Sequence, residues 1–144
     1  MPEYGPESEK QLATCHQILQ QVFRRVIADF DCSITQGHRG EAEQNAVLAA
    51  GMSTLPWPKG NHNAVPSMAL DAHPYPWRVG EDVDAQGALL PQGRERFLLF
   101  AGYVLGAARG MGIRMRWGGD WNRNWSTFDE KFKDWFHFEL LLPL

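Results

Sequence analysis

Two histidines and two aspartates stand at positions where they can form a catalytic metal site. His62 lies in a proline-rich loop, Asp71 in a short segment that alternates apolar and polar residues, and His137 in a second alternating segment near the C-terminus. Two imidazoles and one carboxylate from separate segments form a catalytic zinc set with an open fourth position. Asp134, three residues before His137, is placed to act as a general base toward water at such a site.

A simpler interpretation of these histidines is that they are surface or hydrogen-bonded residues. The chain has five histidines, and it contains no HExxH, CxxC or GxGxxG motif that would single out particular ligands. Spacing alone therefore leaves both interpretations open.

Two segments with period-two alternation are predicted to be the strands that carry the aspartate and the second histidine. In 68–72, Asp71 points away from the side that holds Met68 and Leu70. In 135–141, one face carries Phe136, Phe138 and Leu140, and the other carries Trp135, His137 and Glu139. Further strands are expected over 32–35 and 113–117. A strand that buries one face presents the other to a cleft or to a second layer, so the candidate ligands lie on non-core faces.

Helical periodicity predicts three helices between these strands. The first begins with a capping box at Ser8 and Gln11 and ends near Asp29. The second runs from 41 to 50 and is closed by Gly51, and the third runs from 92 to 109. The segments 53–66 and 74–91 are rich in turn residues and read as loops. The mixture predicts an α+β fold.

Length and composition favour one domain, 1–144, with a substantial core. Hydrophobic residues make up 44% of the 144 residues and charged residues 22%. A formal net charge of −3 argues against a nucleic-acid partner, and no apolar run is long enough to insert into a membrane. The N-terminal residues do not resemble a secretory signal. We expect Cys15 and Cys32 to be reduced thiols in the core of a protein made in a cytoplasm. Aromatic residues, at 12% with six tryptophans, are numerous enough to line a groove as well as a core.

Four ordered blocks resemble the phage L-alanyl-D-glutamate peptidases, a branch of the zinc peptidases that includes the D-alanyl-D-alanine carboxypeptidases and dipeptidases. The blocks are KGNHNAVPSMALD at 59–71 followed by PYP at 74–76, GHR at 37–39 with Gln44, WGGDW at 117–121, and DWFHFE at 134–139. Together they span most of the chain from 34 to 140.

The resemblance implies a hedgehog-like fold, with a small antiparallel sheet flanked by helices, and a role for each matched residue. His62, Asp71 and His137 would bind Zn²⁺, Asp134 would be the catalytic base, and Arg39 would stabilise the oxyanion of the tetrahedral intermediate. The residues expected to line the substrate cleft are Gln44, Ser67, Asp120, Trp121 and Trp135.

The function implied is zinc-dependent hydrolysis of the L-Ala–D-Glu bond in peptidoglycan stem peptides by a phage or prophage lysis enzyme, an endolysin. We expect a monomer that accumulates in the host cytoplasm and reaches the wall through a separate membrane pore. One alternative is a D-alanyl-D-alanine carboxypeptidase or dipeptidase with the same metal set. A non-enzymatic alternative is a zinc-containing wall-binding module, against which the intact Asp134 counts.

Overall fold

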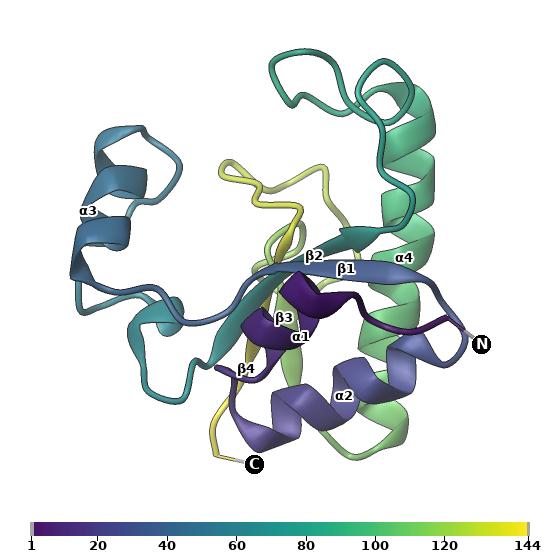
Figure 1. Ribbon diagram of the computed structural model, residues 1–144. Helices are drawn as coiled ribbons and strands as arrows, with labels where there is room; N and C mark the ends of the chain where they lie inside the picture. The colour runs from purple at the N-terminus through teal and green to yellow at the C-terminus, as the bar shows by residue number, and fades with distance from the viewer. Residues whose placement is uncertain (1, 144) are drawn as a thin grey trace.

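A four-stranded antiparallel sheet forms the centre of the computed structural model, which describes residues 2–143 (Figure 1). Its strands, in spatial order, are β1 (Cys32–Gln36), β2 (Ala69–Pro74), β4 (His137–Leu140) and β3 (Met115–Trp117). All three neighbouring pairs are antiparallel. The α+β fold with a small antiparallel sheet is therefore confirmed.

Strand register brings the candidate ligands of two strands to one place. Asp71 of β2 lies directly opposite His137 of β4. On the other side of β2, Asp71 is paired with Gln36, after an irregularity that separates Gln36 from Ile34 in β1. The end of β1 thus leads the chain directly to the same part of the sheet.

The helices are α1 (Pro6–Leu12), α2 (Gln17–Ile27), α3 (Glu41–Ala49) and α4 (Pro91–Gly110), with a short 3₁₀ helix, η1 (Asn61–Asn63). The expected second and third helices are confirmed as α3 and α4, while β3 and β4 are shorter than the segments predicted for them. No helix in residues 2–143 is both long and apolar enough to cross a bilayer.

The prediction of one continuous first helix from Ser8 to Asp29 is wrong. The chain turns between α1 and α2, where Cys15 pairs with Ser67 and His16 Nδ1 accepts the amide of Ile18 to cap α2. Ser8 is not a cap either, because its hydroxyl accepts the amide of Ile34 in β1. The apolar residues continue at helical spacing across this turn, because α1 and α2 each bury an apolar face.

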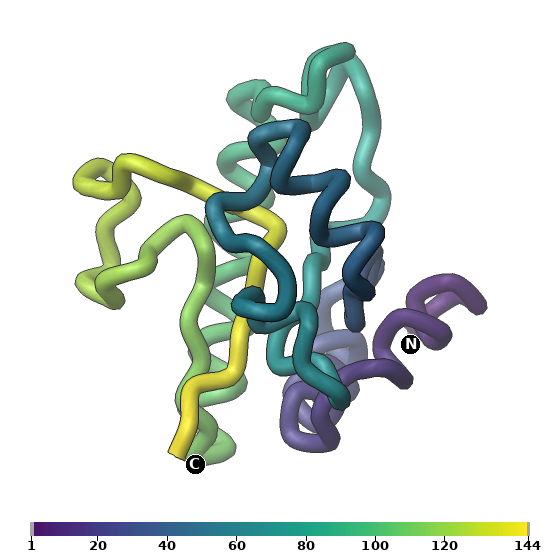
Figure 2. The backbone as a smooth tube through the Cα atoms, turned by 90° about the vertical axis from the view of Figure 1, so that its left-hand side faces the viewer, coloured from purple at the N-terminus to yellow at the C-terminus, as the bar shows by residue number. Residues whose placement is uncertain are grey.

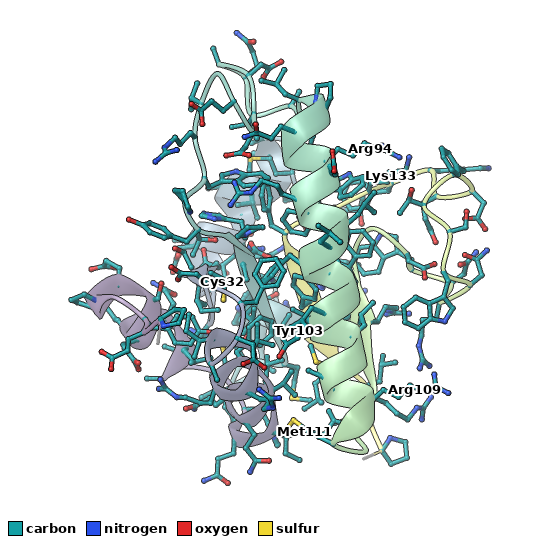
Figure 3. The ribbon with its side chains drawn as sticks, turned by 90° about the vertical axis from the view of Figure 1, so that its right-hand side faces the viewer. Cys32, Arg94, Tyr103, Arg109, Met111 and Lys133 are labelled. Carbon is teal, nitrogen blue, oxygen red and sulfur yellow. The ribbon has the colours of Figure 1, made fainter. Side chains whose placement is uncertain are left out.

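The core lies where α2 and α4 pack against each other and α4 packs against the sheet (Figures 1 and 3). Phe23, Phe97, Phe100 and Phe138 are fully buried there, and their rings meet mostly edge to face. Such aromatic packing contributes a large share of the apolar burial in a small domain. It fixes the sheet, and the two central strands of that sheet carry Asp71 and His137.

By contrast, α3 stands apart from this core (Figure 1). Gln44 is its only buried residue among those described. The segments on either side of α3 carry Arg39 and His62, so polar contacts rather than apolar packing must hold these two residues.

Candidate active site

Three ligand atoms from three segments converge beside the sheet. His62 Nε2 lies 3.2 Å from His137 Nδ1 and 3.3 Å from Asp71 Oδ1, and the last two atoms are 3.9 Å apart. Four ligands placed tetrahedrally at zinc bond lengths are about 3.3 Å from one another. One potential ligand atom from each of the three residues lies within 4.8 Å of the other two. The spacing thus matches three corners of a metal-binding tetrahedron.

Each imidazole is turned by a hydrogen bond on its far nitrogen. His62 Nδ1 lies 2.8 Å from the carbonyl oxygen of Gly37, which can only accept, so Nδ1 carries the proton. His137 Nε2 lies 2.7 Å from Glu139 Oε1 and donates to that carboxylate. Both remaining nitrogens therefore direct a lone pair at the same point as Asp71. Such outer partners fix the orientation and basicity of metal-bound histidines.

The residues present fit a divalent cation. Asp71 Oδ1 is buried and has no hydrogen-bond partner within the described residues, although two imidazole nitrogens face it. The lone pairs of the two imidazole nitrogens and of the carboxylate oxygen face one another and repel. A bound cation would remove this repulsion. Two nitrogens and one oxygen suit zinc or a similar transition metal better than calcium or magnesium.

Arg39 is held over the same site by a buried polar network. Its Nη2 lies 3.7 Å from Asp71 Oδ2, and its Nη1 donates to Gln44 Oε1 at 3.1 Å. Gln44 Oε1 also accepts from Asn63 Nδ2, while Gln44 Nε2 donates to the carbonyl of Leu55 at 2.7 Å. The amide of Gln44, 1% exposed, is thus fully used in placing other groups. It orients Arg39 rather than offering an atom to a ligand.

Asp134 lies in the same cleft, at the entry to β4. Burial raises the pKa of its carboxyl, and the negative charge of Asp71 adds to the rise. Its backbone is tied to Gly118 by an amide hydrogen bond of 2.8 Å. A Cβ on Gly118 would fall 2.1 Å from the carbonyl oxygen of Asp134, so only glycine permits this approach. A partly buried carboxyl with a raised pKa is suited to accepting a proton and giving it up again.

A similar restriction applies to Gly37, whose carbonyl orients His62. A Cβ there would fall 2.3 Å from the carbonyl oxygen of Gln11 in α1. The glycines of two sequence blocks are thus explained by close backbone approaches that place His62 and Asp134.

The cleft around these groups has a volume of ≈ 650 Å³. Figure 2 looks onto this side of the molecule, with the segment around α3 on one side of β4 and the loop 120–134 on the other. Its lining includes the three candidate ligands, Arg39, Gln44, Asp134 and Trp121. The ring centroids of Trp121 and His137 are 5.2 Å apart. A cleft of this size accommodates a short peptide.

Three residues expected to line the cleft are placed elsewhere. Ser67 is fully buried and donates to the carbonyl of Ala69, because the strand begins later than its alternation suggested. Asp120 accepts the amides of Asn124 and Trp125 and stabilises its own loop. Trp135 turns to the other side and packs on Trp117. None of the three lines the cleft, so a role in contacting a ligand there is not supported.

Several contributors were not assigned a role from sequence. Glu139, which alternation places on the same strand face as His137, is 3% exposed and receives two hydrogen bonds from Arg116, at 2.7 and 3.1 Å. The available signal was its alternation with His137 on one strand face. Asn63, which joins Gln44 to the backbone of Arg39, and the cleft cations Lys59 and Lys131 gave no sequence signal.

Comparison with known proteins identifies the family. A solved structure, that of Serratia marcescens L-Ala D-Glu endopeptidase ChiX, shares the fold with a TM-score of 0.62 and 24% identity, over 96% of this chain and 90% of that one. A relative named L-alanyl-D-glutamate peptidase, from Escherichia phage T5, is 33% identical over 131 residues, which are 89% of this chain and 88% of the relative. The family model described as phage L-alanyl-D-glutamate peptidase matches residues 3–141, and the chain therefore belongs to that family.

Proposed function

We propose that the protein is a zinc-dependent endopeptidase that hydrolyses the L-Ala–D-Glu bond of peptidoglycan stem peptides. The observation that carries this proposal is the convergence of two imidazole lone pairs and one orphaned carboxylate oxygen, at tetrahedral spacing, in a peptide-sized cleft. Family membership supplies the substrate class.

His62, Asp71 and His137 would hold the metal. Zinc held there would supply a Lewis acid for the scissile carbonyl and would lower the pKa of water toward ~7. Asp134 then takes a proton from the attacking water and passes it to the nitrogen of the leaving D-glutamate. Burial and the neighbouring Asp71 charge favour the protonated form of Asp134, which assists the second transfer.

Arg39 supplies a positive charge beside the carbonyl oxygen of the substrate. The interaction between the two becomes stronger as that oxygen turns into an oxyanion. The guanidinium is a planar donor of several N–H groups, and its hydrogen bond to Gln44 fixes its plane before substrate arrives.

The biological setting we propose is lysis of a bacterial host at the end of phage growth. The protein would act as a monomer, accumulate in the host cytoplasm and meet the wall through a separate membrane pore. Fractionation of cells before and after pore formation tests this location.

Zinc quantitation combined with digestion of purified peptidoglycan tests the activity. We expect about one equivalent of zinc per chain, and mass spectrometry should detect fragments with a new N-terminal D-glutamate. Released D-alanine would instead indicate a D-alanyl-D-alanine carboxypeptidase or dipeptidase. Less than half an equivalent of zinc after mild purification would contradict the metal assignment.

Two substitutions separate metal binding from proton transfer. Asp134→Ala should retain zinc and lose roughly 10²–10⁴-fold in kcat, the usual contribution of a general base. His137→Ala should lose the metal itself. Full lytic activity in the Asp134 variant would refute the role of the base and favour reassigning it.

A further inference from the structure

A second hollow, of ≈ 390 Å³, lies next to the cleft. It is bounded by the end of α4, the residues that lead into β3, and the loop 120–125. Its lining includes four arginines, namely Arg109, Arg114, Arg116 and Arg123. Figure 3 shows Arg109 projecting from the last turn of α4 toward the side on which that loop stands. A chain with a formal net charge of −3 thus gathers four arginines around one small space, here called the arginine hollow.

The positive charge of the arginine hollow is only partly neutralised. Within residues 2–143, Arg109, Arg114 and Arg123 form no ion pair, whereas Arg116 is paired with Glu139. The one carboxylate in the lining, Asp120, already accepts two backbone amides of its own loop, at 3.1 and 2.8 Å. Unpaired cations around a concave surface concentrate positive potential and attract an anion.

The same loop adds an aromatic wall. The amide of Trp125 donates to Asp120, and the Trp125 residue is 67% exposed at the rim of the hollow. An aromatic face beside guanidinium groups suits a ligand that joins an anionic group to an apolar chain. Amino-acid residues with a free carboxylate have this composition.

Arg116 connects the arginine hollow to the catalytic cleft, because it lines both. On the cleft side its Nη2 contacts Glu139 at 2.7 Å, and its guanidinium lies 5.4 Å from the ring of Trp121. The two spaces therefore adjoin at the Arg116–Glu139 pair, so a substrate held in the cleft beside Trp121 lies next to the hollow.

The chemistry of the stem peptide indicates which of its parts arrives there. L-alanine is attached to the glycan through its amino group, so the free carboxylates all lie on the D-glutamate side of the scissile bond. We propose that the arginine hollow binds a free carboxylate of this leaving part and selects substrates that carry it; the inference rests on the proposed function. The planar fork of arginine pairs with a carboxylate through two parallel hydrogen bonds.

Calorimetric titration of the full-length, metal-loaded chain tests the proposal without requiring turnover. The probes are the leaving peptide, from γ-linked D-glutamate to the terminal D-alanine, and the same peptide with all its carboxylates amidated. In the triple variant Arg109→Gln/Arg114→Gln/Arg123→Gln, the Kd for the acid should rise roughly tenfold, as expected for the loss of several exposed ion pairs. Binding of the amide should be weak and equal in the wild type and the variant.

A matched triple variant, Lys10→Gln/Arg25→Gln/Arg78→Gln, removes the same charge outside the cleft and the arginine hollow and should bind like the wild type. On intact peptidoglycan, the hollow variant should show a raised KM with kcat unchanged. An equal loss for acid and amide, an equal loss in the matched variant, or no binding of the acid by the wild type would overturn the proposal.

Two further outcomes separate the hypotheses. If the triple arginine variant loses binding of inorganic polyphosphate but still binds the leaving peptide like the wild type, the carboxylate assignment is overturned. The ligand of the hollow would then be a phosphate-bearing polymer. Arginine-dependent binding of the leaving peptide without cleavage of peptidoglycan supports the hollow and contradicts the proposed function. Cleavage of the L-Ala–D-Glu bond with no dependence on the arginines contradicts the hollow alone.

Discussion

The candidate metal site is assembled from two regions that the protein holds in different ways. The strand arm, made of Asp71 on β2, Arg116 on β3, and His137 and Glu139 on β4, is fixed by strand register over a core of phenylalanines. The loop arm, residues 37–63, brings Arg39, Gln44 and His62 from a segment whose helix, α3, buries only Gln44. Figure 1 shows α3 standing away from the sheet that the strand arm belongs to.

This difference determines what keeps each arm in place. Displacing Asp71 from His137 requires breaking the β2–β4 pairing, which is part of the global fold. Two polar contacts hold the loop arm together, namely His62 Nδ1 with the Gly37 carbonyl at 2.8 Å and the Arg39 amide with the His62 carbonyl at 2.8 Å. The Arg39–Asp71 ion pair, at 3.7 Å, joins this arm to the sheet. A metal that binds both arms therefore stabilises the loop arm most.

Removal of the metal should give the largest effect and separate the two arms. Chelation should abolish peptidase activity, and hydrogen–deuterium exchange should accelerate across 37–63 while β2 and β4 change little. The reason is that His62 loses its bond to the strand arm, whereas Asp71 and His137 keep their strand pairing. Amides of α2 and α4 serve as an internal reference, and readdition of zinc should reverse the change. Equal acceleration in both arms would contradict the distinction.

Glu139→Gln should weaken the strand arm without unfolding it. The amide keeps the shape of the side chain but loses the charge that Arg116 and His137 share, so the His137 imidazole becomes a poorer ligand. Loss of such a partner usually lowers metal affinity about 10–100-fold. Competition with a chromogenic chelator measures this affinity directly.

Glu130→Gln is the matched control for that change, because Glu130 lines the same cleft but does not contact His137. Its metal affinity should stay within about threefold of the wild type, as expected for a more distant charge. If both variants lose affinity equally, the effect belongs to the charge of the cleft, and the specific role of Glu139 is wrong.

The two arms also differ in how far sequence could predict them. Alternation placed Asp71 and His137 on non-core faces because a strand repeats every two residues, and the structure brings these residues opposite each other. The loop arm has no periodicity, so Arg39 and Gln44 were found only through resemblance to a family, and His62 was a candidate that spacing alone could not separate from the other histidines. Neither approach assigned Asn63, since its role depends on contacts with residues 19 and 24 positions away.

The errors have the same cause. Ser67, Asp120 and Trp135 were expected at the cleft because they lie within matched blocks, but proximity in sequence does not set the direction of a side chain. Ser67 sits before β2 begins, and Trp135 before β4 begins, so strand alternation does not govern either of them. Likewise, the break between α1 and α2 is set by a contact with the distant Ser67 and not by a local signal.

Gln44→Leu should give the smallest effect and act on the loop arm alone. The substitution preserves side-chain volume but removes the acceptor of Arg39 and Asn63, so the guanidinium is no longer fixed over Asp71. We expect kcat/KM to fall about tenfold, the equivalent of one hydrogen bond to a charged group, with kcat lowered more than KM is raised. Metal affinity should change little, because none of the three ligands contacts Gln44 directly.

Asn45→Leu, on the exposed side of the same helix, controls for the loss of an amide from α3 and should retain wild-type kinetics. A variant that instead loses zinc, or loses stability throughout the molecule, would show that the loop arm is part of the global fold, and the distinction between the arms would fail.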